Sequence, residues 1–533
     1  MKLTFLGANH EVTGSRTLLE WNEGRYLLVD DGMIQGDNDY ECAECPVSPS
    51  QIEYVLLTHA HIDHSGMIPK LTKNGFDGKI FATEATTDLA GIMLRDSAHI
   101  QMFEAEWRNR KARRSKDIPL YTPEYEMIDA MKAISCFEPV PYGKKTTVDD
   151  GIEVRFTDVG HLLGSSAVEL WLTEDGVTKK IVFSGDLGNK DQPLLKDPQC
   201  VKDADYVLVE STYGDRLHST EKIDYINELK GILENTFSRG GNVVIPSFAV
   251  GRTQEILYFI REIKAQGLVK SLPDFKVFVD SPLAVDATEV FHKNGRECFD
   301  EEAMKFIDKG INPLDFPGLS LAITTDESRE INDIDEPKVI ISASGMCDAG
   351  RIRHHLKHNL WRSESTILFV GYQSVGTLGR ALVDGAEKVK LFGEEIDVKA
   401  EITKIIGLSG HADRDGLLNW MKGFENKPAK VFVVHGEDSV TEVFAKTLQD
   451  ELGLDAYAPY SGTVYDLIQG TFVKETKGIR IVKAEKHAGN PVFERLLAAG
   501  ARLMSIIRKN EHMANKDLAK FADQIDALSD KWG

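Results

Sequence analysis

Three histidines and one aspartate stand within six positions of the segment THAHIDHSG, residues 58–66. In an extended or turning backbone, side chains two positions apart can converge on one ion while the next pair is offset toward another. Imidazole nitrogen suits Zn²⁺, and a carboxylate can complete the ligand set or join two ions. The spacing therefore predicts a metal site. Its residues are His59, His61, Asp63 and His64.

Further ligands are expected from other loops, because a single loop rarely supplies every ligand of a metal site. Three residues flanked by glycine are candidates: His161 in DVGHLLG, Asp186 in FSGDLG and His411 in LSGHAD. Glycine permits tight turns and a close approach of the backbone to a site. Each of the three alone is typical of a structural turn, but their joint presence with the histidine cluster favours a shared metal centre.

The elements that must position these residues fall into three stretches. Residues 1–205 are predicted to be β-rich, and several strands end in a polar residue at the start of a loop. Residues 206–395 alternate strand and helix, which predicts a largely parallel sheet. Residues 396–480 return to strands, so a first domain is interrupted by a second. Residues 485–533 have apolar positions at helical spacing, which predicts an amphipathic helical extension.

Apolar runs bounded by turn residues give the individual elements. The predicted strands are 15–21, 25–30, 55–58, 79–82, 153–158, 167–173 and 180–184 in the first stretch, 206–209, 242–246, 276–279, 338–342 and 366–370 in the second, and 402–408 and 430–434 in the third. Helices are predicted near 219–238 and 250–265.

The pattern H-x-H-x-D-H, followed by a Gly-His, a Gly-Asp and a late Gly-His, resembles the metallo-β-lactamase fold. The βα insertion between Asp186 and His411 is similar to the β-CASP module of the nucleic-acid-processing branch. The resemblance covers about residues 1–470, and it points to bacterial and archaeal relatives of the cleavage and polyadenylation endonuclease subunit. It implies an α/β architecture: a metallo-β-lactamase αββα sandwich with an inserted Rossmann-like β-CASP domain and a helical C-terminal tail.

The resemblance also implies a role for each residue of the cluster. Asp30, in LVDDG, corresponds to an acidic strand end that orients a metal ligand without touching the metal. Glu210, in VLVESTYG, corresponds to the acidic strand end of the first insertion motif. The implied catalytic carboxylates are Asp30, Asp63, Asp186 and Glu210. The implied ligands of two Zn²⁺ per chain are His59, His61 and His161 on one ion, Asp63, His64 and His411 on the other, and Asp186 between them.

Two such ions about 3.5 to 4 Å apart can share a hydroxide and stabilise both oxygens of an in-line phosphodiester displacement. The sequence thus predicts a zinc-dependent ribonuclease that hydrolyses RNA phosphodiester bonds with a dizinc-activated hydroxide. The alternatives are a DNA nuclease or small-ester hydrolase on the same metal core, and a catalytically inactive RNA-binding scaffold. The long insertion disfavours small substrates because it should roof the site, and the filled ligand positions disfavour a scaffold.

Two turns of the insertion are suited to binding phosphate. The segment SFAVGR ends in Arg252 and precedes a predicted helix, so backbone N–H groups and the guanidinium could face an anion together. The segment SASGM offers a second turn with Ser344 and Gly345. Both segments resemble β-CASP signatures. Without the resemblance, either is as typical of a capped helix start.

One position departs from the family pattern. In eukaryotic relatives the segment that resembles GYQSVGTLGR, residues 371–380, continues to a histidine thought to assist the leaving group, and Ala381 stands there in this chain. Arg380, a metal-bound water or one of the histidines 354, 355 and 358 could substitute, and the sequence does not choose among them. The same difference leaves the preference for RNA over DNA open.

Composition limits the partners and the location. The 533 residues carry a formal net charge of −21, which argues against indiscriminate nucleic-acid binding, although local patches can differ. The sequence has neither a membrane span nor a signal peptide, so a cytoplasmic protein without membrane contact is predicted. The expected partners are single-stranded RNA and, through the amphipathic tail, a second copy of the chain. Cleavage within or from the end of RNA, and the physiological substrate, stay undetermined.

Overall fold

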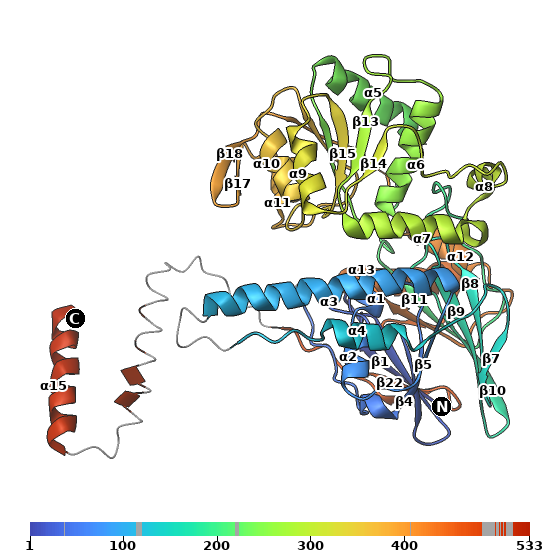
Figure 1. The fold of residues 1–533 in the computed structure, drawn as a ribbon. Coiled ribbons are helices and arrows are strands. Elements are labelled where there is room, and N and C mark those ends of the chain that lie inside the picture. The colour runs from blue at the N-terminus through green and yellow to red at the C-terminus, as the bar shows by residue number, and fades with distance from the viewer. Residues whose placement is uncertain are drawn as a thin grey trace. The chain divides into compact units, whose positions relative to one another are not determined.

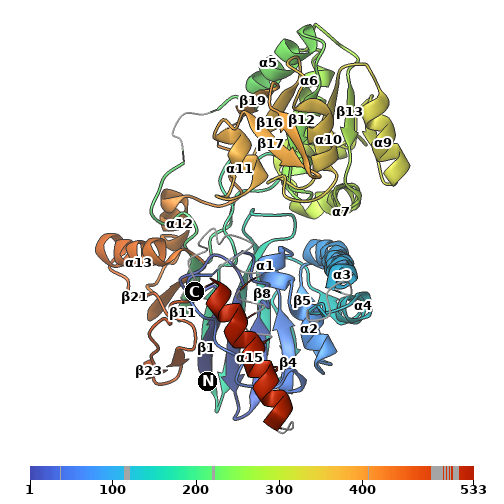
Figure 2. The ribbon, with the colours of Figure 1, turned by 90° about the vertical axis from the view of Figure 1, so that its left-hand side faces the viewer.

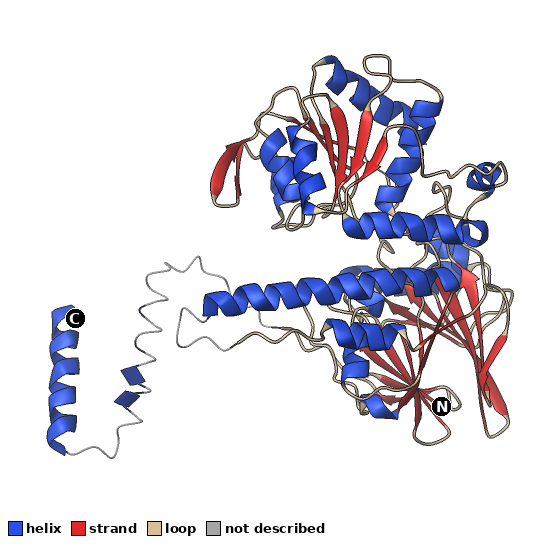
Figure 3. Cartoon of the chain, viewed as in Figure 1, coloured by secondary structure: helices blue, strands red, loops and turns tan. Residues whose placement is uncertain are grey.

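The computed structural model describes residues 1–36, 38–112, 120–218, 223–405, 407–481, 496, 500, 503–504, 506–507 and 515–532. The chain divides into two compact units, Met1–Ile479 and Arg480–Gly533. The elements of both are labelled in Figure 1, and Figure 3 distinguishes helices from strands. Among the described residues, no helix is long and apolar enough to cross a membrane.

Two sheets of the first unit form a sandwich. The first sheet has eight strands, in the order β23 (Thr471–Lys474), β22 (Val464–Asp466), β1 (Lys2–Gly7), β2 (Arg16–Trp21), β3 (Arg25–Val29), β4 (Ile52–Leu56), β5 (Lys79–Ala82) and β6 (Phe137–Pro139). The second has seven, in the order β21 (Ala456–Tyr457), β20 (Lys430–Val434), β11 (Tyr206–Glu210), β10 (Val177–Phe183), β9 (Ser166–Glu174), β8 (Ile152–Asp158) and β7 (Thr146–Asp149).

Large apolar side chains fill the space between the two sheets. Trp21, Phe156 and Phe432 are buried there, and the Phe432 ring lies 4.9 Å from the ring of Phe5. Helices cover both outer faces, as Figure 2 shows, so the αββα sandwich is confirmed. On the first sheet they are α1 (Ile62–Ser65), α2 (Ile68–Lys73), α3 (Glu84–Ala112) and α4 (Met127–Ile134), and on the second α12 (Arg414–Met421) and α13 (Asp438–Leu452).

The insertion folds around a third sheet of six parallel strands. Its order is β14 (Leu319–Leu321), β13 (Lys276–Val279), β15 (Lys338–Ser342), β12 (Val243–Pro246), β16 (Thr366–Phe369) and β19 (Glu401–Lys404). Every residue of β12 is buried, because a parallel sheet with helices on both faces leaves no exposed side. The insertion is therefore the Rossmann-like domain that the sequence predicted.

Alternate residues of β12 face opposite helical layers of this domain. Val243 and Ile245 pack on the side of α5 (Tyr225–Ser238), α6 (Arg252–Ala265), α7 (Pro282–Cys298) and α8 (Glu301–Ile307). Val244 packs on the side of α9 (Thr325–Asp333), α10 (Ile352–Asn359) and α11 (Leu378–Val383). The period of two is that of a β-strand.

The third sheet extends further along the chain than the sequence suggested. The return to the first domain was expected at residue 396, with a strand over 402–408. Instead β19 pairs in parallel with β16, with Ile402 opposite Ile367, and the hairpin of β17 (Lys388–Leu391) and β18 (Glu394–Asp397) precedes it. A strand run shows no sign of which sheet it joins, because sheet membership depends on partners distant in the sequence.

The other predicted strands agree with the observed ones to within three residues at either end. In the C-terminal unit the structure describes α15 (Asn515–Trp532), which lies in the predicted helical extension. Most of the preceding stretch of that extension, 485–514, lies outside the described residues.

Candidate metal centre

Loops at one end of the sandwich bring the chemically active residues together. His59 follows β4 of the first sheet, and Asp186 follows β10 of the second. The strands β10, β11 and β20 are parallel neighbours, with Phe183 opposite Leu208 and Glu210 opposite Val434. Because carboxyl ends of parallel strands meet at one edge of a sheet, the residues that follow these strands converge.

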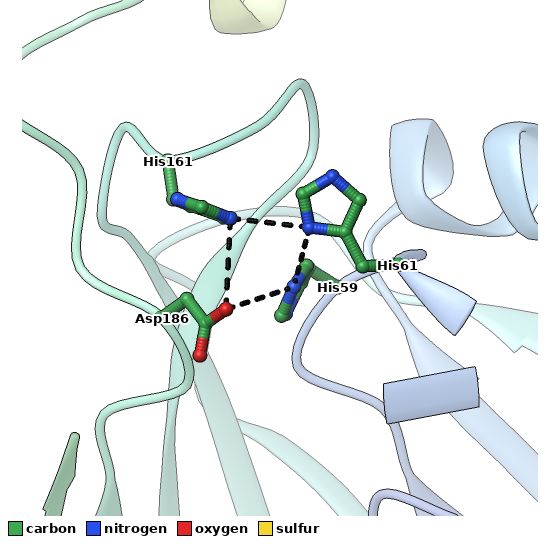
Figure 4. A group of neighbouring side chains, drawn as sticks. All are labelled: His59, His61, His161 and Asp186. Atoms are coloured by element: carbon green, nitrogen blue, oxygen red, sulfur yellow. Dashed lines mark hydrogen bonds and ion pairs between the residues drawn. The ribbon is translucent and has the colours of Figure 1, made fainter. Parts of the chain in front are cut away.

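Three histidines and Asp186 form a first group, shown in Figure 4. His61 Nδ1 lies 3.1 Å from both His59 Nε2 and His161 Nε2. Asp186 Oδ2 lies 3.6 Å from the same two Nε2 atoms. In a tetrahedral zinc site with Zn–N distances near 2.0–2.1 Å, ligand atoms are about 3.3 Å apart. The four side chains therefore fit one zinc ion.

Asp63, His64 and His435 form a second group. His435 Nε2 lies 3.1 Å from His64 Nε2 and 3.6 Å from Asp63 Oδ2. Asp186 Oδ1 lies beside this group, at 3.2 Å from His64 Nε2; its contact with His435, at 3.6 Å, is to the other ring nitrogen, Nδ1. One carboxylate oxygen of Asp186 thus faces each group, as a bridging ligand would.

The second oxygen of Asp186 gives a test of whether a cation belongs here. Asp186 is 2% exposed, and its Oδ1 accepts no hydrogen bond from the described residues. A buried carboxylate oxygen without a donor is costly, and a cation would satisfy it. The donor set of imidazoles and carboxylates is the one that zinc prefers.

The structure differs from the ligand set implied by the sequence at one position. His435, rather than His411, lies beside Asp63 and His64. His435 follows β20 in the segment VVHGE. A histidine at the end of a strand and next to glycine is the same pattern that marked the other candidates, so the sequence could have identified His435 as a candidate ligand. His411 also has this signal, and the sequence does not separate the two because both arise late in the chain.

His411 instead lies against Glu210. Its Nδ1 is 3.3 Å from Glu210 Oε1 and 4.0 Å from Asp186 Oδ2, so these three residues form a further group that could approach an ion. However, Glu210 already accepts backbone N–H groups, from Leu187 at 2.6 Å and from Thr212 at 3.1 Å. A carboxylate engaged on both oxygens is better suited to orienting His411 than to binding metal.

Hydrogen bonds fix the orientation of the ligand imidazoles. Asp30 Oδ2 lies 2.7 Å from His64 Nδ1, and Thr58 donates to Asp30 from its backbone N–H at 2.9 Å and its hydroxyl at 3.0 Å. His161 Nδ1 donates to the carbonyl oxygen of Gly410 at 2.9 Å. Both contacts occupy Nδ1 and leave Nε2 to the metal group. Asp30 therefore lies where the sequence implied, behind a ligand.

Burial and charge set the protonation of the two groups. Burial lowers the pKa of His59 and of His161 well below the usual range, so these imidazoles are neutral and can ligate. Burial opposes protonation of His64 too, but Asp186 and Asp30 raise its pKa well above the usual range. The carboxylates thus attract positive charge to this end of the sandwich, which also suits a cation.

Backbone geometry at the centre is unusual at two non-glycine residues. Asp30 and His435 have φ angles of 59° and 51°, in the left-handed region that side chains disfavour. Glycine allows a close approach after His435, since a Cβ at Gly436 would lie 2.2 Å from Ser211 Oγ. Strain of this kind is concentrated at functional sites, where surrounding contacts compensate for it.

The predicted phosphate-binding residues are engaged in other contacts. The guanidinium of Arg252 contacts the carboxylate of Glu255 and the carbonyl oxygen of Leu408. Ser344 Oγ donates to Ala349 O at 3.4 Å, and Gly345 O accepts from Gln373 Nε2 at 3.1 Å. Arg252 therefore ties the insertion to the loop that carries His411.

A buried histidine and aspartate cluster on an αββα sandwich defines a metal-dependent hydrolase of the metallo-β-lactamase superfamily. Three family models match the chain: "Metallo-beta-lactamase superfamily" over residues 14–91, "Beta-Casp domain" over 253–382 and "Zn-dependent metallo-hydrolase RNA specificity domain" over 395–459. The last range contains both His411 and His435. The chain belongs to the β-CASP family of this superfamily.

Several curated relatives match along most of the chain. It is 36% identical over 449 residues to "Ribonuclease TTHA0252" of Thermus thermophilus, covering 84% of this chain and 96% of the relative. It is 31% identical over 469 residues to an "RNase J-like protein" of Methanocaldococcus jannaschii (87% and 99%) and 30% identical over 471 residues to "Transcription termination factor FttA" of the same organism (86% and 70%).

A solved structure shares the fold at low identity. It is a protein of unknown function from Enterococcus faecalis V583, with a TM-score of 0.50 and 14% sequence identity, covering 87% of this chain and 99% of that chain.

The two late histidines can be distinguished by metal content. His435→Ala removes a donor from the second group, so we expect the zinc content of purified protein, measured by mass spectrometry, to fall by about one ion per chain. His411→Ala should leave the zinc content unchanged. His99→Ala, at an exposed position of α3, is the matched control. Loss of zinc from the His411 variant alone would contradict this assignment.

Proposed function

We propose that the protein is a zinc-dependent ribonuclease that hydrolyses phosphodiester bonds of single-stranded RNA. The observation that carries the proposal is the pair of ligand groups joined by the buried carboxylate of Asp186. The RNA specificity domain match and the relative named as a ribonuclease support RNA as the substrate. The depth of the centre supports a single strand, because a duplex is too wide to bring a phosphate to side chains as buried as His59 and Asp186.

The proposed ligands would hold two zinc ions per chain. His59, His61 and His161 would hold the first and Asp63, His64 and His435 the second, with Asp186 available to both. Bound there, the ions would lower the pKa of a water molecule and stabilise charge on the entering and leaving oxygens of the phosphodiester. Asp30 keeps Nε2 of His64 directed at the second ion.

His411 is the proposed donor of a proton to the leaving oxygen. Its Nδ1 faces Glu210, so Nε2 is the nitrogen that can reach substrate, and 23% of the side chain is exposed. Its backbone is held as well, since the His411 carbonyl oxygen lies 2.9 Å from His218 Nε2. His411 would therefore supply the acid that the alanine at position 381 cannot supply.

Three of the other candidates for the acid are held in contacts elsewhere. His355 is buried, with Nε2 2.7 Å from Asp280 and Nδ1 2.9 Å from Asn332. His354 stacks on Phe392 at 4.4 Å, and Arg380 donates to Asp384 at 2.9 Å. These contacts favour His411 as the proton donor.

Cleavage of end-labelled RNA tests the proposed activity. We expect zinc-loaded protein to cut unstructured RNA and His59→Ala to cut at least about 100-fold more slowly, because the ion that this residue binds carries the chemistry. Labelled RNAs with a 5′-triphosphate, monophosphate or hydroxyl would report the direction of cleavage. Equal rates on DNA of the same sequence would show that the enzyme is not specific for RNA. Turnover of small esters without cleavage of RNA would indicate a small-ester hydrolase instead. Equal activity of wild type and His59→Ala would refute the proposal.

The role of His411 predicts a pH dependence. Burial lowers its pKa, but Glu210 and Asp186 more than offset this and raise it to about 9. The protonated imidazole is therefore present below that pH and is lost above it, so the cleavage rate should fall at alkaline pH. Glu210→Gln removes the partner charge, so the fall should move to lower pH. His411→Ala should reduce kcat by about 100- to 10,000-fold, the range for loss of a general acid. An unchanged pH profile in Glu210→Gln would contradict this role.

The C-terminal extension is a proposed dimer contact. In α15, Leu518, Phe521, Ile525 and Leu528 follow one another at intervals of three or four, which places them on one side of the helix. Deletion of residues 486–533 is expected to lower the mass measured by light scattering from that of a dimer to that of a monomer, with unchanged zinc content. If the measured mass corresponds to the same number of chains before and after deletion, this contact is excluded.

A further inference from the structure

The carboxyl edge of the third sheet carries exposed aromatic side chains. Phe248, in the loop after β12, is 49% exposed, and Tyr372, in the loop after β16, is 67% exposed. Large aromatic side chains are normally among the more buried residues, so two exposed rings on adjoining loops are candidates for contact with a ligand. Loops at the carboxyl ends of parallel strands are also where open α/β sheets bind ligands.

Hydrogen bonds and packing hold the two aromatic loops together. Gln373, next to Tyr372, donates through Nε2 to the carbonyl oxygens of Gly345 at 3.1 Å and Gly371 at 3.2 Å. Gly345 lies against Phe248, since a Cβ there would be 3.3 Å from the phenyl ring. The aromatic side chains are therefore presented by a fixed edge.

This edge adjoins the metal centre on two sides. In the loop of Phe248, a Cβ at Gly251 would lie 3.3 Å from Leu162, the neighbour of the proposed ligand His161. Tyr372 lines a pocket of about 560 Å³ whose other wall includes Tyr213 and His218. The Tyr213 ring lies 6.0 Å from the His411 ring, and His218 contacts the His411 backbone. The Phe248 loop thus borders the metal centre beside His161, and the pocket with Tyr372 borders it beside His411.

The arginines of the same region face carboxylates. The pairs are Arg216 with Asp215, Arg252 with Glu255, Arg351 with Asp280, and Arg380 with Asp384. A guanidinium that is neutralised in this way attracts phosphate weakly. Lys404 adds one positive charge to the pocket wall, in a chain whose formal net charge is −21. Binding of a polyanion here needs a contribution that does not depend on charge.

We propose that Phe248 and Tyr372 are stacking platforms for unpaired bases of the RNA on either side of the scissile phosphate, and that stacking outweighs phosphate contacts at this edge. Every base has a face that can stack on an aromatic ring, so such platforms accept many sequences but require unpaired bases. This inference rests on the proposed ribonuclease function and adds to it the residues that select single strands.

Substitution of each ring tests the platforms. For Phe248→Ala and Tyr372→Ala we expect the KM for cleavage of an unstructured RNA decamer to rise by about 5- to 100-fold each, the range for loss of one stacked base. The kcat at saturating RNA should change little, and zinc content should stay that of wild type. Tyr372→Trp should retain the wild-type KM, because another aromatic ring can stack. Phe103→Ala removes an exposed phenyl ring of α3, outside the pocket, and serves as the matched control.

Salt dependence separates stacking from charge. A lost phosphate contact would reduce the slope of log affinity against log salt by about 0.7 for a single strand. The affinity measured over a salt series should therefore fall in Phe248→Ala and Tyr372→Ala while the slope stays that of wild type. An unchanged KM in both alanine variants, or a reduced slope, would overturn the proposal.

A small substrate distinguishes failure of this inference from failure of the proposed function. The kcat for hydrolysis of bis(4-nitrophenyl) phosphate, measured at saturating diester so that any stacking of its rings does not limit the rate, reports on the metal centre and should be equal in wild type and in both alanine variants. Wild-type protein that hydrolyses this diester but does not cut RNA would refute the ribonuclease proposal and this inference with it. Wild-type protein that cuts RNA while both alanine variants keep its KM would refute the stacking platforms only.

Discussion

The two-sided contact of Asp186 is the constraint on which the rest of the site depends. Its Oδ2 faces His59 and His161, and its Oδ1 faces His64 and His435. Negative charge buried to this degree is unfavourable unless it is paired with positive charge. The centre therefore suits cation binding, and the surrounding loops must hold the ligand atoms within a few tenths of an ångström.

A direct contact joins the insertion to the loop that carries His411. Arg252, at the start of α6, contacts the carbonyl oxygen of Leu408, and the chain then runs through Gly410 to His411. Gly410 in turn accepts from His161 Nδ1, so the same short loop orients one proposed metal ligand and carries the proposed proton donor. A residue that the sequence marked as a phosphate contact thus joins the two domains. Its guanidinium contacts Glu255 and the Leu408 carbonyl oxygen inside the protein.

Local patterns predicted much of the fold. The strand runs other than 402–408 were correct to within three residues at their ends, because burial in a sheet depends on residue types within a short window. The limit of the insertion was harder to predict, since β19 follows a β-hairpin and then joins β16 in the third sheet. The sheet that a strand joins depends on pairing with residues distant in the sequence, and a short apolar run does not specify which strand it will pair with.

The sequence by itself determined the chemistry of the centre. The spacing of His59, His61, Asp63 and His64 after a strand is a local property, and it was enough to predict a metal site with histidine and aspartate ligands. Only the tertiary structure decided which late histidine joins the second group. His411 and His435 share the same local signal, but the pairing of β20 with β11 carries His435 to the edge beside Asp63, while Glu210 engages His411. The distinction depends on strand register and on contacts between residues more than 200 positions apart, as for Glu210 and His411.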